Sequence, residues 1–485
     1  MSSSNPLPVN MSTEGETKLL EEMKLADKDE QVQAQSKNEK PIPVTLLSGF
    51  LGSGKTTLLK HILESSSHKL KVAVIVNDMA ELNIDADLVR RDKIVQAERE
   101  IISLQNGCIC CTLRGDLIRE IARIRASNAE FDYVLIESTG IAEPQAVAQS
   151  FVFDPNTQQL AASEEEMLWT QAKLDTCVTV IDAHMFLSHI GTLEKFGDKY
   201  ADGLDKSTPE GLKEGEKPIA NLLMEQVEFA NVILLNKTDL VDSEEQLNKT
   251  KQAITTLNPE AKIVMTNHSK IDLKEILNTG VFDMLKASKS PGWLKEIRKI
   301  QENPALAHGE GEADEYGVSS FVYRQRLPFH PGRFAQWVDT ILHFANEWKD
   351  LPLECRQEVV KDPKYQHMQK EYGNLMRAKG FCWLAEHDSF IIGFAQSGRI
   401  GTLAPVMPWY TILPEDQWGV LDGSDDYEVI QSKFFEPHGD RRQELVFIGT
   451  DLNVENITQA LDKCIMTKKE LKKYKFYTDQ SSLGK

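Results

Sequence analysis

The sequence predicts an α/β fold, a parallel sheet wound on both faces by helices, followed by a smaller α+β domain. Short apolar runs rich in β-branched residues alternate with helical segments across residues 41–285. A glycine-rich loop directly follows the first of these runs, at the place where α/β folds bind phosphate. Beyond residue 316, shorter runs with alternating apolar residues indicate hairpin strands beside two amphipathic helices.

The chain of 485 residues is long enough for two or three domains with sizeable cores. Residues 1–40 are polar and charged, so we expect a mostly disordered tail. The first domain is expected over 41–285, a polar and partly acidic linker over 286–316, and the second domain over 317–470. A short tail over 471–485 is expected to follow.

The composition argues against several classes of protein. A net charge of −19 makes nucleic acid an unexpected main partner, because phosphate backbones are bound by basic patches. There is no run of 18 apolar residues and no apolar signal-peptide core, so we expect no membrane span and no export. Three of the seven cysteines lie within four positions, which indicates a reducing compartment, and we expect the cytoplasm.

The first strand is expected at Val44–Ser48, and the glycine-rich loop follows it at Gly49–Thr56. The loop matches the phosphate-binding pattern G-x-x-x-x-G-K-[ST] at every position, and a helical run follows. Its glycines allow a tight turn that points backbone N–H groups at phosphate oxygens. Lys55 is expected to reach the β- and γ-phosphates, and the Thr56 hydroxyl to bind Mg²⁺. A glycine turn with a chance lysine is the alternative, which the matching flanks disfavour.

A second strand at Lys71–Val76 runs into a loop with several carboxylates, including Asp78 and Glu81. Because this loop follows the carboxyl end of a parallel strand, it lies on the ligand side of the sheet. We expect it to be the first switch, a loop that responds to the γ-phosphate. A solvated acidic loop is the alternative.

Three thiols follow, at Cys108, Cys110 and Cys111. In a reducing compartment such a cluster can bind Zn²⁺ or another soft or borderline metal ion, with a further ligand from elsewhere. The nearest carboxylates in sequence are Asp78 and Glu81. Two alternatives remain: buried small side chains at a helix start, and a redox dithiol.

The next strand, Phe131–Ile136, runs into Glu137-Ser138-Thr139-Gly140. A carboxylate at this strand end is the usual acidic residue on the Mg²⁺ side, so Glu137 is expected to bind Mg²⁺ directly or through water. Gly140 permits close approach of the backbone to the γ-phosphate. An ordinary strand-end carboxylate is the alternative.

The apolar run Val232–Leu235 leads into Asn236-Lys237-Thr238-Asp239, the sequence N-K-x-D with which GTPases bind guanine. The Asp239 carboxylate accepts from the guanine N1–H and exocyclic amine, and adenine offers no matching pair of donors. The sequence therefore predicts GTP rather than ATP as the nucleotide. The last strand of this domain is expected at Ala261–Thr266, followed by a second wall of the base pocket.

The second domain begins with an expected strand at Val318–Arg324 and an amphipathic helix at Arg333–Phe344. Two hairpin strands at 380–385 and 390–395, a strand at 444–449 and a closing helix with an apolar stripe from Ile457 to Ile465 follow. Residues 357–373 are polar and are interpreted as an insertion. No catalytic constellation is evident, and His330 and His438 are candidate metal contacts for which a structural role is favoured.

The order of these motifs resembles that of the CobW-type GTPase metallochaperones. The resemblance rests on the stretches at 49–56, 77–86, 106–114, 137–140 and 236–239 and continues to about residue 465. The similarity is greatest to the zinc-responsive YciC-like branch. Two stretches, N-D-M-[AS]-E and C-I-C-C-T-L-R, are also similar to those of cobalt-delivering nitrile hydratase activators.

The resemblance implies slow GTP hydrolysis coupled to delivery of a metal ion, Zn²⁺ or alternatively Co²⁺ or Ni²⁺, to a client metalloprotein. It also implies metal binding by the three clustered thiols, aided by Glu81. The sequence departs from some relatives, because Val76 stands where they carry another Glu and the linker is acidic rather than His-rich. The residues expected to bind nucleotide are Gly49, Gly52, Ser53, Gly54, Lys55, Thr56, Thr57, Gly140, Asn236, Lys237 and Asp239.

Overall fold

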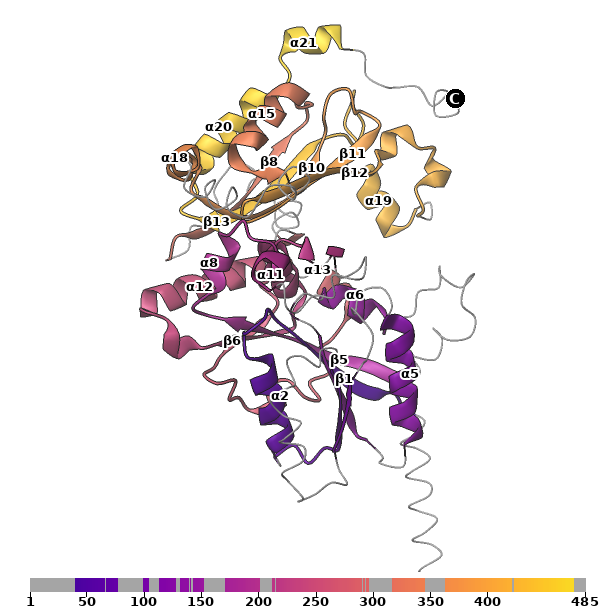
Figure 1. Ribbon diagram of the computed structural model, residues 1–485. Helices are drawn as coiled ribbons and strands as arrows, with labels where there is room; N and C mark the ends of the chain where they lie inside the picture. Colours follow the sequence, from indigo (N-terminus) through magenta and orange to yellow (C-terminus); the bar gives the residue numbers. More distant parts are fainter. Residues whose placement is uncertain are drawn as a thin grey trace, which may run out of the picture.

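The structure, a computed structural model, consists of a parallel-sheet domain and a second sheet domain stacked on it (Figure 1). The described residues are 40–65, 67–76, 99–103, 113–127, 131–138, 140, 143–151, 171–200, 212–213, 215–289, 291–292, 294–295, 316–344, 363–420 and 423–474. Side chains are not described at 99–103, 113–116, 343–344, 363–365 and 425–426. The two expected tails lie almost entirely outside these ranges.

The first domain contains a seven-stranded sheet in the order β3-β2-β4-β1-β5-β6-β7, and every neighbouring pair is parallel. Its strands are β1 (Ile42–Ser48), β2 (Val72–Val76), β3 (Arg99–Ser103), β4 (Tyr133–Glu137), β5 (Ala172–Asp182), β6 (Val232–Asn236) and β7 (Lys262–Met265). The predicted parallel sheet is confirmed. The edge strand β3 was not predicted, because charged residues precede its short apolar stretch.

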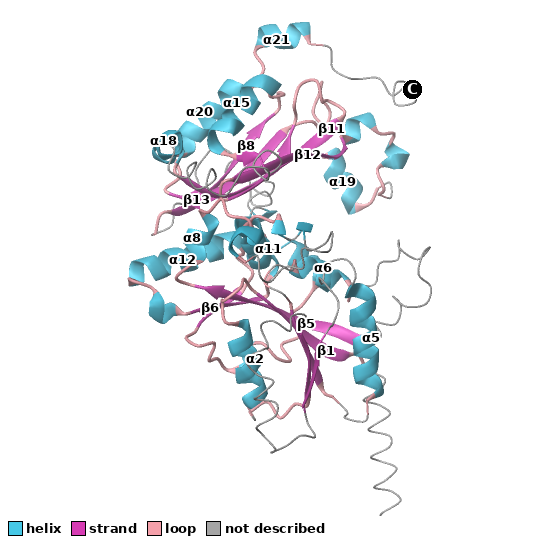
Figure 2. Ribbon diagram, in the orientation of Figure 1, coloured by secondary structure: helices cyan, strands magenta, loops and turns pink. Residues whose placement is uncertain are grey.

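Helices cover both faces of this sheet (Figure 2). Consecutive strand residues point to opposite faces, so Leu46 packs with the helix residue Ile121 while Leu47 packs with Leu58 of another helix. The helices are α2 (Lys55–Glu64), α5 (Leu113–Ala126), α6 (Pro144–Gln149), α8 (Phe186–Ile190), α9 (Phe196–Lys199), α11 (Ile219–Phe229), α12 (Glu244–Leu257) and α13 (Met284–Lys289). The helix α13 includes the first residues of the expected linker, and its Ala287 is buried in the core.

The second domain is built on a six-stranded sheet in the order β8-β13-β10-β11-β12-β9, antiparallel except for the β12–β9 pair. Its strands are β8 (Val318–Gln325), β9 (His343–Phe344), β10 (Asn374–Cys382), β11 (Phe390–Ser397), β12 (Ile400–Pro408) and β13 (Gln443–Thr450). Its helices are α15 (Pro331–Ile341), α18 (Pro363–Tyr372), α19 (Asp425–Gln431), α20 (Val454–Cys464) and α21 (Lys468–Lys473). The helices α15, α18 and α20 lie together on one face of the sheet (Figure 1).

Two expectations for this domain are corrected, and one strand was not predicted. The helix predicted to reach Phe344 ends at Ile341, because Leu342 is extended and the next two residues pair with β12. The stretch interpreted as a polar insertion contains α18, whose Met368 and Tyr372 are buried against α15 and α20. The strand β12 was not predicted, since its prolines and small residues obscure the pattern.

One apolar core joins the two domains. From the second sheet it includes Val318, Val322 and Val446, and from the first domain residues of α11 and α12. Phe50 of the glycine-rich loop belongs to the same core and is 3% exposed. The second domain is therefore packed against elements that position the loop. Within the described residues, no helix is both long and apolar enough to cross a membrane.

Candidate nucleotide-binding site

The glycine-rich loop spans the turn from β1 to α2, at the carboxyl edge of the parallel sheet. Gly54 caps the start of α2 in the left-handed region, at φ 112°. A Cβ atom at this position would lie 2.3 Å from Asn236 Nδ2, so only glycine fits. Gly49 and Gly52 lie in the same turn, and Thr57 is exposed on the first turn of the helix. These placements agree with the phosphate-binding pattern.

Lys55 and Ser53 supply buried polar groups inside this loop. The Lys55 side chain is buried, and its Nζ donates to the backbone carbonyl of Phe50 at 3.3 Å. Ser53 Oγ is also buried and has no hydrogen-bond partner among the residues that the structure describes. A buried hydroxyl without a partner is costly, and a phosphate oxygen would satisfy it. The donor set of the loop therefore fits a phosphate.

The Glu137 carboxylate lies beside the loop because β4 pairs with β1 in a register that sets Glu137 opposite Leu47. Ser138 N–H donates to the Leu47 carbonyl at 2.9 Å, which extends this pairing past the end of the strand. Thr56 Oγ1 donates to Glu137 Oε1 at 3.5 Å. A hydroxyl and a carboxylate are the hard oxygen ligands that Mg²⁺ prefers, so this pair fits the ion.

Gly140 is packed directly on the glycine-rich loop. A Cβ atom there would lie 2.8 Å from the backbone nitrogen of Leu51, so the close approach requires glycine. Gln226 of α11 is buried, and its Nε2 donates to the Gly140 carbonyl at 3.0 Å. Gly140 is thus held between the loop and α11. Gln226 was not predicted, because a single glutamine within an apolar helix has no recognisable sequence signature.

The N-K-x-D residues begin at the end of β6, and Asn236 contacts the loop. Asn236 Nδ2 donates to the Ser53 carbonyl at 2.9 Å, and Asn236 Oδ1 accepts from Ser269 N–H at 3.0 Å. Lys237 Nζ forms an ion pair with Asp182 Oδ2 at 2.7 Å. Asp239 is exposed, so its carboxylate is accessible to a guanine base. Asp182 could have been identified from sequence as an acid that ends a strand.

The predicted metal site lies outside the described residues, since Cys108, Cys110, Cys111, Glu81 and Asp78 all fall in ranges that are not described. Among the described residues no group of three or more potential metal ligands is found. The three described cysteines are buried individually at 177, 382 and 464. Burial raises the pKa of the Cys464 thiol to about 11, which disfavours the thiolate form that binds metals.

The two histidines considered as metal contacts have other surroundings. His330 caps α15, where its Nδ1 accepts from Arg333 N–H at 3.4 Å. The His438 ring packs against the Trp383 indole, with 5.1 Å between centroids. His330 therefore caps a helix, and His438 packs on an aromatic ring.

Ionisable side chains of α11 connect the site to the second domain. Glu228 and Arg377 form two hydrogen bonds, Nε to Oε1 at 2.8 Å and Nη2 to Oε2 at 2.9 Å. Both side chains are more than nine-tenths buried.

Glu225 lies on the same helix as Glu228 and has a raised pKa. Burial, and then the nearby charge of Glu143, raises the pKa of Glu225 to about 7, against the opposing effects of Arg377 and Lys217.

The raised pKa of Glu225 predicts a pH-dependent stability. Between pH 4.5 and about 7 the native state retains a proton that the unfolded chain has released, so stability falls as pH rises. We expect Glu225→Gln to unfold like the wild type near pH 4.5 and to be more stable by about 2 kcal/mol above pH 7. Urea unfolding at a series of pH values measures the difference. A difference that is constant with pH would contradict the assignment.

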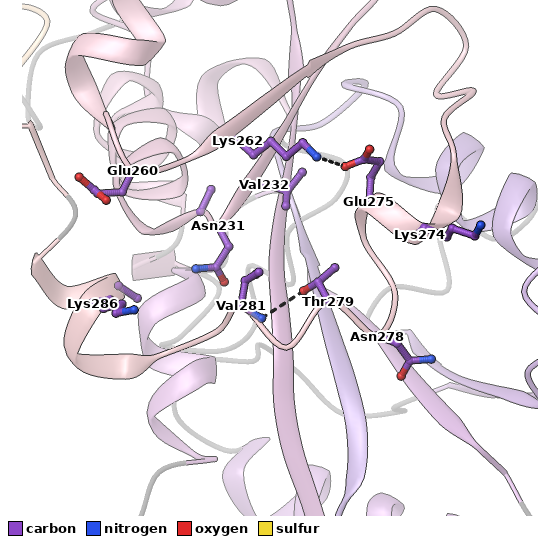
Figure 3. Close-up of a pocket in the computed structure, with 12 residues that line it drawn as sticks. Asn231, Val232, Glu260, Lys262, Lys274, Glu275, Asn278, Thr279, Val281 and Lys286 are labelled. Atoms are coloured by element: carbon purple, nitrogen blue, oxygen red, sulfur yellow. Dashed lines mark hydrogen bonds and ion pairs between the residues drawn. The ribbon is translucent and has the colours of Figure 1, made fainter.

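A cavity of about 510 Å³ lies at the opposite edge of the sheet, near the amino ends of β6 and β7 (Figure 3). Val232, Asn278 and Thr279 contribute to its walls, and Lys262 and Glu275 form an ion pair at its side. Since the glycine-rich loop and Asn236 lie at the carboxyl edge, this cavity is not part of the nucleotide site.

Comparisons with known proteins identify the family of each domain. The model of the CobW/HypB/UreG nucleotide-binding domain matches residues 43–265, and that of the cobalamin synthesis protein CobW C-terminal domain matches 318–465. The zinc-regulated GTPase metalloprotein activator 1 of Dictyostelium discoideum is 38% identical over 439 residues, 89% of this chain and 81% of that protein. The zinc chaperone CobW of a Sinorhizobium species is 30% identical over 332 residues, 67% of this chain and 84% of that protein.

A solved structure of zinc-bound YjiA GTPase from E. coli aligns over 88% of this chain and 100% of its own, at 20% identity and a TM-score of 0.33. The two family models divide the chain where the two sheets divide it, and the first covers every nucleotide-binding residue predicted from the sequence. The chain therefore belongs to the CobW/HypB/UreG family of P-loop GTPases and carries the CobW C-terminal domain.

Proposed function

We propose that this GTPase is a metallochaperone. It binds a divalent transition metal ion, zinc in preference to cobalt or nickel, through Cys108, Cys110 and Cys111 with help from Glu81. It transfers the ion to a client metalloprotein in the cytoplasm, and GTP controls the transfer. The observation that carries this proposal is the 38% identity, across both domains, to a zinc-regulated GTPase metalloprotein activator. Clustered thiols are also the ligand type that zinc favours.

The described geometry supports the following roles at the nucleotide end of the mechanism. Lys55 and the backbone of the loop bind the β- and γ-phosphates of GTP, and the exposed Asp239 carboxylate accepts from guanine. Thr56 and Glu137 would hold Mg²⁺, which supplies positive charge against the phosphates when bound. Gln226 holds Gly140 against the loop, which supports a role for Gly140 in the response to the γ-phosphate.

Metal and nucleotide binding are proposed to be linked. In the chain, the thiols lie between two segments that follow strands at the nucleotide edge, β2 and β4. If GTP and GDP favour different arrangements of these segments, each nucleotide must change the metal affinity, and the metal must change nucleotide affinity by the same factor. Zinc titrations in the presence of GDP and of a non-hydrolysable GTP analogue measure this factor. Equal affinities would remove the coupling.

The variant Cys110→Ser tests the metal site. We expect its zinc affinity to fall by at least about tenfold while GTP binding stays unchanged, because a hydroxyl is a poor substitute for a thiolate ligand. Cys177→Ser is the matched control, since Cys177 is buried in the first domain and burial raises its pKa. Unaltered zinc binding by Cys110→Ser would instead favour a GTP-dependent binding switch whose clustered cysteines are structural.

A further inference from the structure

Four cationic side chains gather at one end of the second sheet. Arg324 and Arg326 lie at the end of β8, Arg442 precedes β13, and Lys433 follows α19. Contacts and charge interactions connect them: Arg326 Nη1 donates to the Lys433 carbonyl at 2.9 Å, and the charge of Arg442 acts on both Arg326 and Lys433. We refer to these four residues as the cationic cluster.

Carboxylates only partly balance the cationic cluster. Glu444 is almost fully buried and is shared, since Arg324 contacts its Oε1 and Arg442 Nε contacts its Oε2 at 2.7 Å. Among the described residues, no carboxylate lies within ion-pair distance of Arg326 or Lys433. Burial, and then the positive charge of Arg442, lowers the pKa of both groups, against the opposing charges of Glu444 and Asp440. Since four cations face these two carboxylates, the cluster retains an excess of positive charge in a chain whose net charge is −19.

An exposed aromatic ring borders these cations. The Arg326 guanidinium lies 4.0 Å from the centroid of the Phe435 ring, and Phe435 is 56% exposed. Arginine held over an aromatic ring is oriented at little entropic cost, and this pair of residue types is enriched where proteins bind proteins. The surface thus combines an oriented guanidinium group with a solvent-exposed apolar ring.

The position of the cationic cluster is fixed by the register of the sheet. Glu444 pairs with Arg324, and Val446, two residues further along β13, packs in the core shared with the first domain. Residues two apart in a strand share a face, so Arg324 and Glu444 lie on the face that packs against the first domain. The cluster occupies the end of this face, beyond the apolar contact.

We infer that the cationic cluster and Phe435 form a docking surface for a carboxylate-rich segment of a partner protein. Bidentate pairs between arginine and carboxylate would supply affinity, and the charge excess would steer the encounter. Arg324 and Arg442 already bind the Glu444 carboxylate, so Arg326 and Lys433 are the cations left for a partner. Successive carboxylates of an acidic segment can pair with both, and the overall negative charge opposes a nucleic acid.

The test uses the full-length protein and a fluorescent oligoglutamate peptide, with binding followed by anisotropy at low ionic strength. We expect the wild type to bind the peptide and Arg326→Glu/Lys433→Glu to bind it at least about tenfold more weakly. The matched control is Lys469→Glu/Lys472→Glu, which makes the same change in charge at exposed positions of α21. GTP turnover of both variants reports whether each is folded.

The inference is supported if the control binds like the wild type and only the cluster variant loses affinity. It is overturned if the wild type does not bind the peptide, or if the two variants lose affinity equally. Competition against the bound fluorescent peptide gives a further test. The inference is also overturned if inorganic phosphate or a single-stranded DNA oligonucleotide displaces this peptide more effectively than unlabelled oligoglutamate does, because the cluster would then be a phosphate site.

Discussion

Replacing Lys55 with alanine is expected to lower kcat/KM for GTP hydrolysis by at least about a hundredfold, the usual loss when one charge-stabilising donor is removed from an active site. The Lys55 ammonium is buried inside the glycine-rich loop and contacts the Phe50 carbonyl. It is therefore already in place before nucleotide binds, and no other described lysine lies in this loop. Release of phosphate from GTP under saturating and limiting substrate measures the loss.

Lys60→Ala is the control for this variant, because Lys60 lies on the same helix and is only half-buried. It should hydrolyse GTP at the rate of the wild type. Thermal unfolding of both variants separates loss of catalysis from loss of structure. Near-normal turnover by a folded Lys55→Ala protein would contradict the assignment of this loop to phosphate.

Replacing Arg377 with alanine is expected to destabilise the protein by about 3–5 kcal/mol, because it leaves the Glu228 carboxylate buried without its cation. The pair joins α11 of the first domain to β10 of the second through two hydrogen bonds, and both side chains are more than nine-tenths buried. Arg377 Nη1 also donates to the Gln396 carbonyl at 3.3 Å. Urea unfolding of the two-domain chain, followed by tryptophan fluorescence, measures the change.

Two further variants make this experiment selective. Arg333→Ala breaks a similar bidentate pair with Glu470, but both of those side chains are about one-third exposed, so a much smaller loss is expected. The double variant Glu228→Gln/Arg377→Met removes both charges and should recover much of the stability lost by Arg377→Ala. Equal losses for Arg377→Ala and Arg333→Ala would show that burial of the first pair does not matter.

The Arg377 variant also tests communication between the domains. Gln226 and Glu228 are two residues apart on α11. Gln226 holds Gly140 beside the glycine-rich loop, and Glu228 binds Arg377 of the second domain. A shift of this helix would therefore reach both sites. If Arg377→Ala changes the affinity for GTP relative to GDP while Arg333→Ala does not, α11 transmits the nucleotide state.

The sequence by itself determined the features that depend on neighbouring residues. The glycine-rich loop, its flanking strand and helix, the N-K-x-D strand end and the hairpin strands of the second domain all have local signatures, because turn geometry and side-chain periodicity are set within a few residues. The same signatures gave the α/β class of the first domain and the family resemblance. They failed where the pattern was weak, as at β3 and α18.

Only the tertiary structure decided which distant groups meet. Glu137 is adjacent to Thr56 because β4 pairs with β1, and Asn236 meets Ser53 across 183 residues of chain. The pair of Glu228 and Arg377 is separated by 149 residues, and no spacing in the sequence marks it. Such contacts arise from strand order, register and the docking of one domain on the other, which are set by the burial of many side chains at once.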